Sequence, residues 1–343
     1  MSPIRVGVAG LGRSGWDIHA RLLEPLREHY TVTAVVDGDP ARRDEAVARF
    51  DCAAYGTYDE LLADPGVELV VVALPSHLHA DAAIAGLAAG KHVVVEKPMA
   101  TSLADADRMV AAAAQADTVL SVFQNRRYNP DFVKVRSLID SGIFGRIVQV
   151  RITESRFGRR WDWQTQRKFG GGTLNNTCPH FLDQALQLFG PREPEVFCHL
   201  DRTLTLGDAD DHVKVVLKGD GAPTVDVEVS SACAYPGETW NIMGTQGGLA
   251  GSTRELRWKW YDPAALPPRE LDFNPTPDRS YNRDEIPWQE GSWSLDEDDT
   301  PGYAGYYLDL FAAIRNGAPL AVTPESVRRV IWLQETCHEM AGF

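Results

Sequence analysis

Several features that would place this chain outside the ordinary globular class are scarce or missing. Its five cysteines are scattered along 343 residues without a CxxC pair, which argues against a disulfide framework and against a zinc site. No apolar run approaches the roughly 20 residues that a membrane span needs, and no separate hydrophobic leader precedes the first strand at Ile4. We therefore expect a reduced, cytoplasmic protein with no metal and no membrane partner.

Positive charge is scarce as well. The 34 lysines and arginines stand against 48 aspartates and glutamates, which gives a formal net charge of −14. Contacts with nucleic-acid phosphates require a basic surface, so nucleic acid is not an expected partner. A solvated acidic surface is the simplest explanation of the excess.

The chain has enough residues and enough apolar side chains to form two domains, each with its own hydrophobic core. Up to residue 125, helical patterns alternate with short β-branched runs, as expected of strands buried on both faces. The runs are Ile4–Ala9, Val32–Val36, Leu69–Leu74, His92–Val95 and Val119–Phe123. This alternation predicts an α/β domain over residues 1–125 with a doubly wound parallel sheet.

Residues 126–343 follow a different pattern, which we interpret as a second α/β domain. Alternating strands are expected at Ile147–Ser155, Glu195–Leu206, His212–Lys218 and Thr224–Cys233, with helices at Pro130–Ser141 and Pro179–Phe189. Such strands predict a mostly antiparallel sheet with helices on one face and an open face that would suit a dimer contact.

The end of the second domain is less regular. Residues 262–302 show no clear period and are expected to form a long ordered loop or flap. Trp288 and Trp293 in this stretch would either cover a site or pack in a core, and packing is favoured. The final helical patterns, Tyr306–Arg315 and Pro324–Met340, could return to pack on the first domain.

A glycine-rich turn follows the first strand. Its residues, Gly10-Leu11-Gly12-Arg13-Ser14-Gly15, fit GxGxxG and open a helical pattern, which is the context that dinucleotide binding requires. Gly10 would make the tight turn, Gly12 would admit the pyrophosphate, and Gly15 would let helix and strand pack closely. The helix amino terminus would favour the phosphates.

Asp37 ends the second strand, where a carboxylate can accept both ribose hydroxyls and repel a 2′-phosphate. This favours NAD over NADP. Arg42 and Arg43 weaken the inference, because either could serve a 2′-phosphate, although solvated helix charges are the favoured explanation of both.

The order and spacing of several short motifs carry a family resemblance. They are GLGRSG, Leu74-Pro75 with His77 and His79, Glu96-Lys97-Pro98, Gln124-Asn125-Arg126-Arg127, Gly170-Gly171-Gly172, His180 with Asp183, and Val322-Thr323-Pro324-Glu325. Together they resemble the Gfo/Idh/MocA family of oxidoreductases, and the stretch from Asp183 to Gly190 looks most like its inositol and sugar dehydrogenase branches.

The resemblance implies a Rossmann domain, a substrate domain with an open sheet, and a homodimer or homotetramer. It implies hydride transfer between NAD, with NADP possible, and a hydroxyl carbon of a sugar or cyclic polyol. It also implies that Leu74, Pro75, His77, His79, Glu96, Lys97 and Gln124 contribute to the cofactor site and that Arg127 and Asp183 contribute to the substrate site.

The resemblance makes Lys97 a catalytic residue, and its chemistry agrees. Alcohol oxidation needs a base for the hydroxyl proton, and a lysine desolvated between cofactor and substrate has a lowered pKa. The alternative is a surface lysine that ends a strand.

His180 is the second expected catalytic residue. Pro179 suits the start of a helix, and Asn176 or Thr177 could cap it. The helix dipole would then keep His180 neutral, and Asp183 would share its face. The alternative is a histidine that only forms a hydrogen bond near a helix start.

Asn176 departs from the family, which often has an aspartate four residues before this histidine. An amide can orient a hydroxyl but cannot take its proton, so the relay falls to Lys97 and His180. Asn176 could also be a helix cap and nothing more.

Charged and aromatic residues precede the glycine run, among them Arg156, Arg160, Trp161, Asp162 and Trp163. Aromatic faces stack on sugar C–H faces, so Arg156, Trp161 and Trp163 are expected substrate residues; packing or plain surface exposure explains them equally well. Two other functions stay open: a glycoside-processing enzyme that oxidises a sugar transiently with bound NAD, and a catalytically silent sugar or cofactor sensor.

Overall fold

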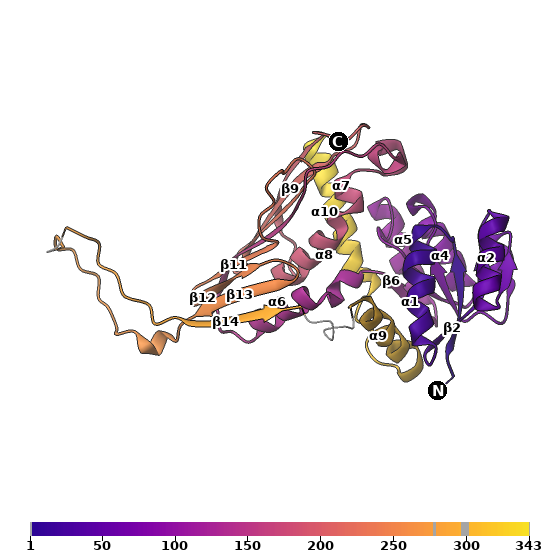
Figure 1. Cartoon of the computed structure of the whole chain (residues 1–343), viewed down its shortest axis with the longest axis horizontal. Helices are drawn as coiled ribbons and strands as arrows, with labels where there is room; N and C mark the ends of the chain where they lie inside the picture. The colour runs from indigo at the N-terminus through magenta and orange to yellow at the C-terminus, as the bar shows by residue number, and fades with distance from the viewer. Residues whose placement is uncertain (1, 277–278, 296–301, 343) are drawn as a thin grey trace.

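The computed structural model describes residues 2–276, 279–295 and 302–342, and its strands form two sheets (Figure 1). The first sheet has the order β3-β2-β1-β4-β5-β6, and every neighbouring pair is parallel. Its strands are β1 (Ile4–Ala9), β2 (Tyr30–Val36), β3 (Ala53–Tyr55), β4 (Leu69–Val72), β5 (His92–Val95) and β6 (Leu120–Val122). This order is that of a Rossmann fold, which confirms the predicted doubly wound sheet.

Helices connect these strands on both faces of the sheet. A π-helical segment (Ser14–Ala20) continues into α1 (Arg21–Leu23), and the others are α2 (Pro40–Phe50), α3 (Tyr58–Ala63), α4 (His79–Ala88) and α5 (Leu103–Gln115). β3 and α3 were not predicted from the sequence. A three-residue strand offers no measurable period, and α3 depends on a capping box between Thr57 and Glu60.

The second sheet has the order β14-β13-β12-β11-β7-β10-β9-β8 and is antiparallel except between β7 and β10. Its strands are β7 (Ile147–Ser155), β8 (Glu195–Asp201), β9 (His212–Lys218), β10 (Thr224–Ser230), β11 (Trp240–Gly244), β12 (Gly247–Gly251), β13 (Glu255–Trp260) and β14 (Gln289–Ser294). The mostly antiparallel sheet is therefore confirmed.

Three details of the second sheet correct the sequence analysis. The strands predicted at 195–206 and 224–233 end at Asp201 and Ser230, and β11 to β13 were not predicted. The stretch 262–302, expected to be irregular, contains β14, whose polar sequence QEGSWS becomes a strand only by pairing with β13. Trp293 of β14 packs against the second core, as favoured, whereas Trp288 is 42% exposed.

Helices cover one face of this sheet: α6 (Pro130–Asp140), α7 (Thr173–Asn176), α8 (Cys178–Phe189) and α10 (Pro324–Ala341). Alternate residues of β9, including Val213 and Val215, are buried against them. Figure 1 shows α8 and α10 between the two sheets, and α10 contacts both α5 and β8.

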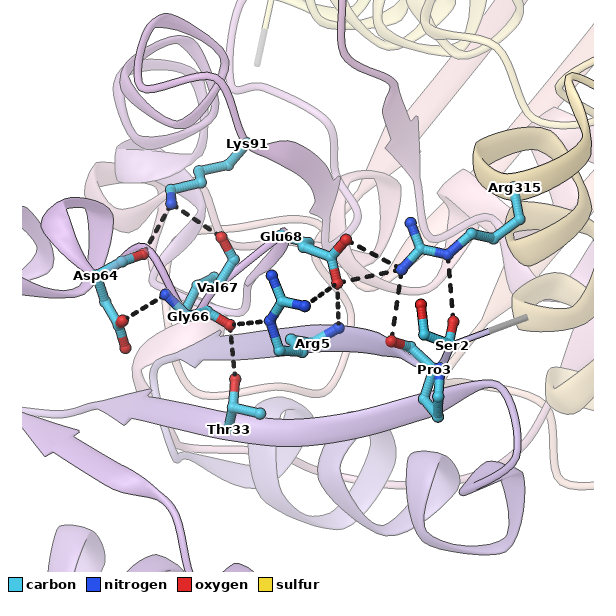
Figure 2. Close-up of polar contacts among 10 residues, drawn as sticks. All are labelled: Ser2, Pro3, Arg5, Thr33, Asp64, Gly66, Val67, Glu68, Lys91 and Arg315. Atoms are coloured by element: carbon cyan, nitrogen blue, oxygen red, sulfur yellow. Dashed lines mark hydrogen bonds and ion pairs between the residues drawn. The ribbon is translucent and has the colours of Figure 1, made fainter.

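The last two helices also complete the first core. Tyr307 of α9 (Gly302–Asn316) and Ile331 of α10 are buried among its residues. At the amino ends of the strands, Arg315 of α9 binds Glu68 at 3.0 Å and donates to the carbonyls of Ser2 and Pro3 (Figure 2). In the part of the chain that the structure describes, no helix is both long and apolar enough to cross a membrane.

Candidate active site

A cavity of about 670 Å³ opens at the carboxyl ends of the parallel strands and reaches the loop before α7. In open α/β sheets, ligands bind at this edge. Of the residues predicted for the site, it is lined by Gly10, Gly12, Arg13, Ser14, Asp37, Leu74, Pro75, His79, Glu96, Lys97, Trp163 and Asn176. The structure therefore brings together residues that are up to 166 positions apart in the sequence.

The glycine turn has the geometry of a dinucleotide cradle. Gly10 has φ +90°, and a Cβ there would lie 2.6 Å from the carbonyl oxygen of Ala73. A Cβ on Gly15 would lie 1.8 Å from the carbonyl oxygen of Gly10, so only glycine allows this close packing. A Cβ on Gly12 would meet no atom within 4 Å. The open space at Gly12 fits a pyrophosphate held at the helix amino terminus.

Asp37 lies at the ribose end of this cradle. Its carboxylate accepts hydrogen bonds from the backbone N–H groups of Leu11 at 2.7 Å and Asp39 at 2.8 Å. Leu11 thus positions Asp37 without lining the cavity. Arg42 lines the cavity and reaches Asp37 at 3.6 Å, whereas Arg43 donates to the Asp37 carbonyl. A cation therefore stands beside the Asp37 carboxylate in the cavity.

Lys97 enters the cavity from the end of β5 and meets the second domain. Its Nζ donates to the backbone carbonyl of Asn176 at 3.1 Å. Burial lowers the pKa of Lys97; Glu96 opposes this shift, and the cations Arg126 and Arg13 add to it. The lysine is thus poised to hold or release a proton closer to neutrality than an exposed amine.

A buried series of polar contacts connects the Lys97 backbone to Glu96, His19 and Tyr307. Glu96 accepts the Lys97 backbone N–H at 2.9 Å and contacts His19 Nε2 at 3.1 Å, while His19 Nδ1 contacts the Tyr307 hydroxyl at 2.7 Å. Burial disfavours the ionised form of Glu96, but His19 and Lys97 outweigh burial and hold its pKa below the usual range. His19 was not predicted as a site residue; the one signal in the sequence was its place as a polar residue in the first helical segment.

His79 holds the two turns of the cavity together. Its Nδ1 lies 2.8 Å from the carbonyl oxygen of Pro98, which follows a cis peptide bond, and its Nε2 lies 2.8 Å from that of Leu74. Burial lowers the pKa of His79, and the two carbonyls oppose this shift. The ring therefore fixes the distance between the turn after β4 and the turn that carries Lys97.

Asn176 and Gln164 both line the cavity and contact each other. The Asn176 Nδ2 donates to Gln164 Oε1 at 2.9 Å, and Arg160 donates to the same oxygen at 2.6 Å. The expected capping of α8 by Asn176 or Thr177 is wrong, because neither side chain accepts a cap hydrogen bond. Thr177 has helical angles, so α8 continues from α7 with no turn of free N–H groups for a side chain to cap.

His180 lies in the first turn of α8, and its buried Nδ1 has no hydrogen-bond partner among the described residues. Burial holds the pKa of His180 well below the usual range, and the cations Lys97 and Arg126 add to this. Desolvation is thus the first cause that favours the neutral ring of His180.

Arg127 and Asp183 lie outside the cavity lining. They form a buried bidentate ion pair with distances of 2.6 and 2.8 Å, and Arg127 also binds Ser326 of α10 at 3.0 Å. The neighbouring Arg126, which the sequence analysis did not single out, lies with its guanidinium 4.8 Å from the centre of the Phe181 ring. The only signal for Arg126 was its place in the same motif.

His180, Gly15 and the remaining predicted residues also lie outside the lining of this cavity. Trp161 is 76% exposed, Arg156 is exposed, Gln124 is buried, and His77 lines a neighbouring cavity. Trp163, 53% exposed, is therefore the one aromatic residue of the predicted rim that lines the main cavity.

Comparison with known proteins agrees with this architecture. Residues 4–124 match the model of the oxidoreductase family with an NAD-binding Rossmann fold, and residues 132–250 match that of the GFO/IDH/MocA C-terminal domain. Myo-inositol 2-dehydrogenase of Thermotoga maritima is 34% identical over 260 residues, which cover 74% of this chain and 76% of that protein.

Other relatives match less of the chain or only its fold. The NADP(+) scyllo-inositol 2-dehydrogenase IolW of Bacillus subtilis is 34% identical over 54% of this chain and 52% of its own. The WlbA dehydrogenase of Bordetella pertussis, solved with NADH and UDP-GlcNAcA, superposes with a TM-score of 0.80 at 23% identity, over 99% of this chain and 96% of that one. The chain belongs to the Gfo/Idh/MocA family and is an NAD(P)-binding oxidoreductase.

Proposed function

We propose that the protein transfers a hydride between nicotinamide and a hydroxyl carbon of a sugar, a sugar derivative or a cyclic polyol. The observation that carries the proposal is the position of Lys97, whose pKa is lowered by burial, in the cavity that contains the glycine turn. The names of the inositol dehydrogenase relatives support the substrate class.

The chain's own residues supply proton transfer and orientation. Bound NAD would lie along Gly10, Gly12 and Asp37, and it supplies the hydride acceptor. The neutral amine of Lys97 takes the hydroxyl proton, and the neutral ring of His180 is the second group able to accept it. The Asn176 amide orients the hydroxyl without titrating.

A panel of sugars and polyols, followed by the absorbance of reduced nicotinamide with NAD and NADP in separate assays, tests this proposal. We expect NADH to form in proportion to oxidised product, and NAD to be favoured because Asp37 repels a 2′-phosphate. Asp37→Ser removes this repulsion and should narrow the preference by about tenfold, which corresponds to about 1.4 kcal/mol of binding free energy.

Two results would contradict the proposal. Cleavage of a glycoside without net NADH would indicate transient oxidation. Binding of sugar and NAD without turnover of any substrate would indicate a sensor. Lys97→Met should retain NAD binding in either case, because the pyrophosphate cradle is formed by other residues.

We also propose that the open face of the second sheet contacts a second copy of the chain. Phe197 and Met243 on this face are 57% and 43% exposed. Light scattering measures the assembly, and Met243→Glu should reduce its mass if this face is the contact.

A further inference from the structure

His19 lies behind the active-site cavity, in the π-helical segment that follows the glycine turn. Its side chain is fully buried, and the ring centre of Phe123 lies 4.4 Å from that of its imidazole. Its Nε2 lies 3.1 Å from Oε1 of Glu96, which lines the cavity. π-helical turns often occur at functional sites, and here the turn carries a titratable side chain to the back of the cavity wall.

Tyr307 of α9 fixes the state of the imidazole. Its hydroxyl lies 2.7 Å from Nδ1 of His19, and burial raises the pKa of Tyr307 well above its usual range, so the hydroxyl keeps its proton. An ionised carboxylate only accepts hydrogen bonds, so Nε2 of His19 donates to Glu96, and Nδ1 is left to accept the tyrosine proton. Both ring nitrogens of His19 are thereby used.

Glu96 connects His19 to Lys97. One carboxylate oxygen of Glu96 faces His19, and the other accepts the Lys97 backbone N–H at 2.9 Å. Burial alone would raise the pKa of Glu96, and the hydrogen bond from His19 is the first of the contacts that oppose burial and hold this pKa low. A buried carboxylate without such a partner would take up a proton.

The other titratable groups around Glu96 offer it no comparable partner. His79 faces it from α4, and Tyr306 and Tyr307 face it from α9. Burial lowers the pKa of His79 and raises those of the two tyrosines, so all three are neutral near pH 7. The ionised state of Glu96 therefore depends on His19 and on Lys97 itself.

The groups around the Lys97 amine make the charge of Glu96 decisive. Burial lowers the pKa of Lys97, the negative charge of Glu96 opposes this shift, and the cations Arg126 and Arg13 add to it. His180 faces the amine from α8 as a neutral ring, because burial holds its pKa low. Glu96 is the one acid among these groups, so a change in its ionisation changes the proton affinity of Lys97.

We infer that His19 is a positioning residue for the reaction: it holds the Glu96 carboxylate ionised and in place beside Lys97, and so controls how strongly the Lys97 amine holds its proton. The inference rests on the proposed function and adds to it a residue that lies behind the cavity wall. Through its contact with Tyr307, His19 also makes α9, at the other end of the chain, part of the proton chemistry.

The pH profile of alcohol oxidation tests this role. Only the neutral amine of Lys97 accepts the hydroxyl proton, so kcat/KM should fall as the pH drops through the pKa of Lys97. His19→Met lets Glu96 take up a proton and removes the charge that opposes burial, so this limb should move to lower pH by about one unit. His19→Gln keeps an N–H donor near the position of Nε2 and should restore the wild-type limb.

Two further variants separate this role from a loss of packing. His19→Asn is polar but too short to reach Glu96, and it should move the limb as His19→Met does. Tyr30→Phe is the matched control, because the Tyr30 hydroxyl is buried in the same core and donates to the Tyr307 carbonyl at 2.7 Å. It should lower the melting temperature and leave the limb in place.

A double variant shows whether His19 acts through Glu96. Glu96→Gln should move the limb in the same direction as His19→Met and at least as far. The double variant His19→Met with Glu96→Gln should move it no further than Glu96→Gln alone. Shifts that add in the double variant, or a limb that Tyr30→Phe moves equally, would contradict the inference.

The titration of Lys97 can also be measured without turnover. NMR of the protein after reductive methylation with ¹³C-formaldehyde follows each lysine, and the signal that Lys97→Met lacks belongs to Lys97. The same Lys97 titration in wild type and His19→Met would overturn the inference. A titration that moves to lower pH in His19→Met, in a protein that oxidises no substrate, would keep the role of His19 and reject the dehydrogenase.

Discussion

Both edges of the parallel sheet hold buried or half-buried charged groups, but these groups have more bonding partners at the amino-terminal edge than at the carboxyl-terminal edge. At the amino ends, Lys91 donates to the carbonyls of Asp64 and Val67, and Arg5 and Arg315 both bind Glu68 (Figure 2). At the carboxyl ends, Lys97 makes one hydrogen bond to a carbonyl and His180 Nδ1 makes none. Satisfied charges hold elements together, whereas groups left with spare bonding capacity are free to bind and transfer protons.

The largest effect is expected where a fully paired charge lies close to the site. Arg127→Leu would leave Asp183 buried and unpaired, which costs about 3–5 kcal/mol of unfolding free energy, as chemical denaturation would measure. The double variant Arg127→Leu with Asp183→Leu should recover much of this loss. If Arg127→Leu instead lowers turnover without loss of stability, the pair belongs to the substrate site.

Substitution of Lys97 at the carboxyl-terminal edge and of Lys91 at the amino-terminal edge tests the difference between the two edges most directly. Lys97→Met should lower kcat by about a hundredfold or more, because the group that takes the proton is removed, with little change in melting temperature. Lys91→Met should do the reverse, since it leaves the buried carbonyl of Val67 without its lysine donor and removes one of the two donors to the Asp64 carbonyl. Near-normal turnover of Lys97→Met would remove this lysine from the mechanism.

The titration of His180 gives a smaller, directional effect. Burial and the cations Lys97 and Arg126 lower its pKa, so the acid limb of kcat/KM should lie below the usual histidine range of about 6.5. Arg126→Met removes one cation and should move that limb to higher pH. An acid limb at the same pH in wild type and Arg126→Met would assign it to another group.

The smallest effect is expected at the amino-terminal edge. Glu68→Gln weakens its pairs with Arg5 and Arg315 and should cost about 1 kcal/mol of unfolding free energy, with kcat unchanged. Burial opposes ionisation of Glu68, but its hydrogen bonds and the two arginines lower its pKa. The wild-type advantage over Glu68→Gln should therefore be present at neutral pH and fall as the pH drops through the lowered pKa.

Local patterns in the sequence determined the parallel sheet. The β-branched runs at Ile4–Ala9 and His92–Val95 and the glycine turn after β1 depend on spacing and backbone freedom within a few residues. A polar strand has no such pattern in its sequence. β14 forms a strand because it pairs with β13 through backbone hydrogen bonds.

The residues of the site also fall into those that the sequence could predict and those that it could not. Residues next to a strand end, such as Asp37 and Lys97, could be nominated from the sequence because every parallel strand delivers its carboxyl end to one edge. Partners brought by distant elements could not: His19 beside Glu96, Gln164 beside Asn176, and Asp183 paired with Arg127. Which charges are paired, and which stay free to react, is a property of contacts across the chain, and only the tertiary structure decided it.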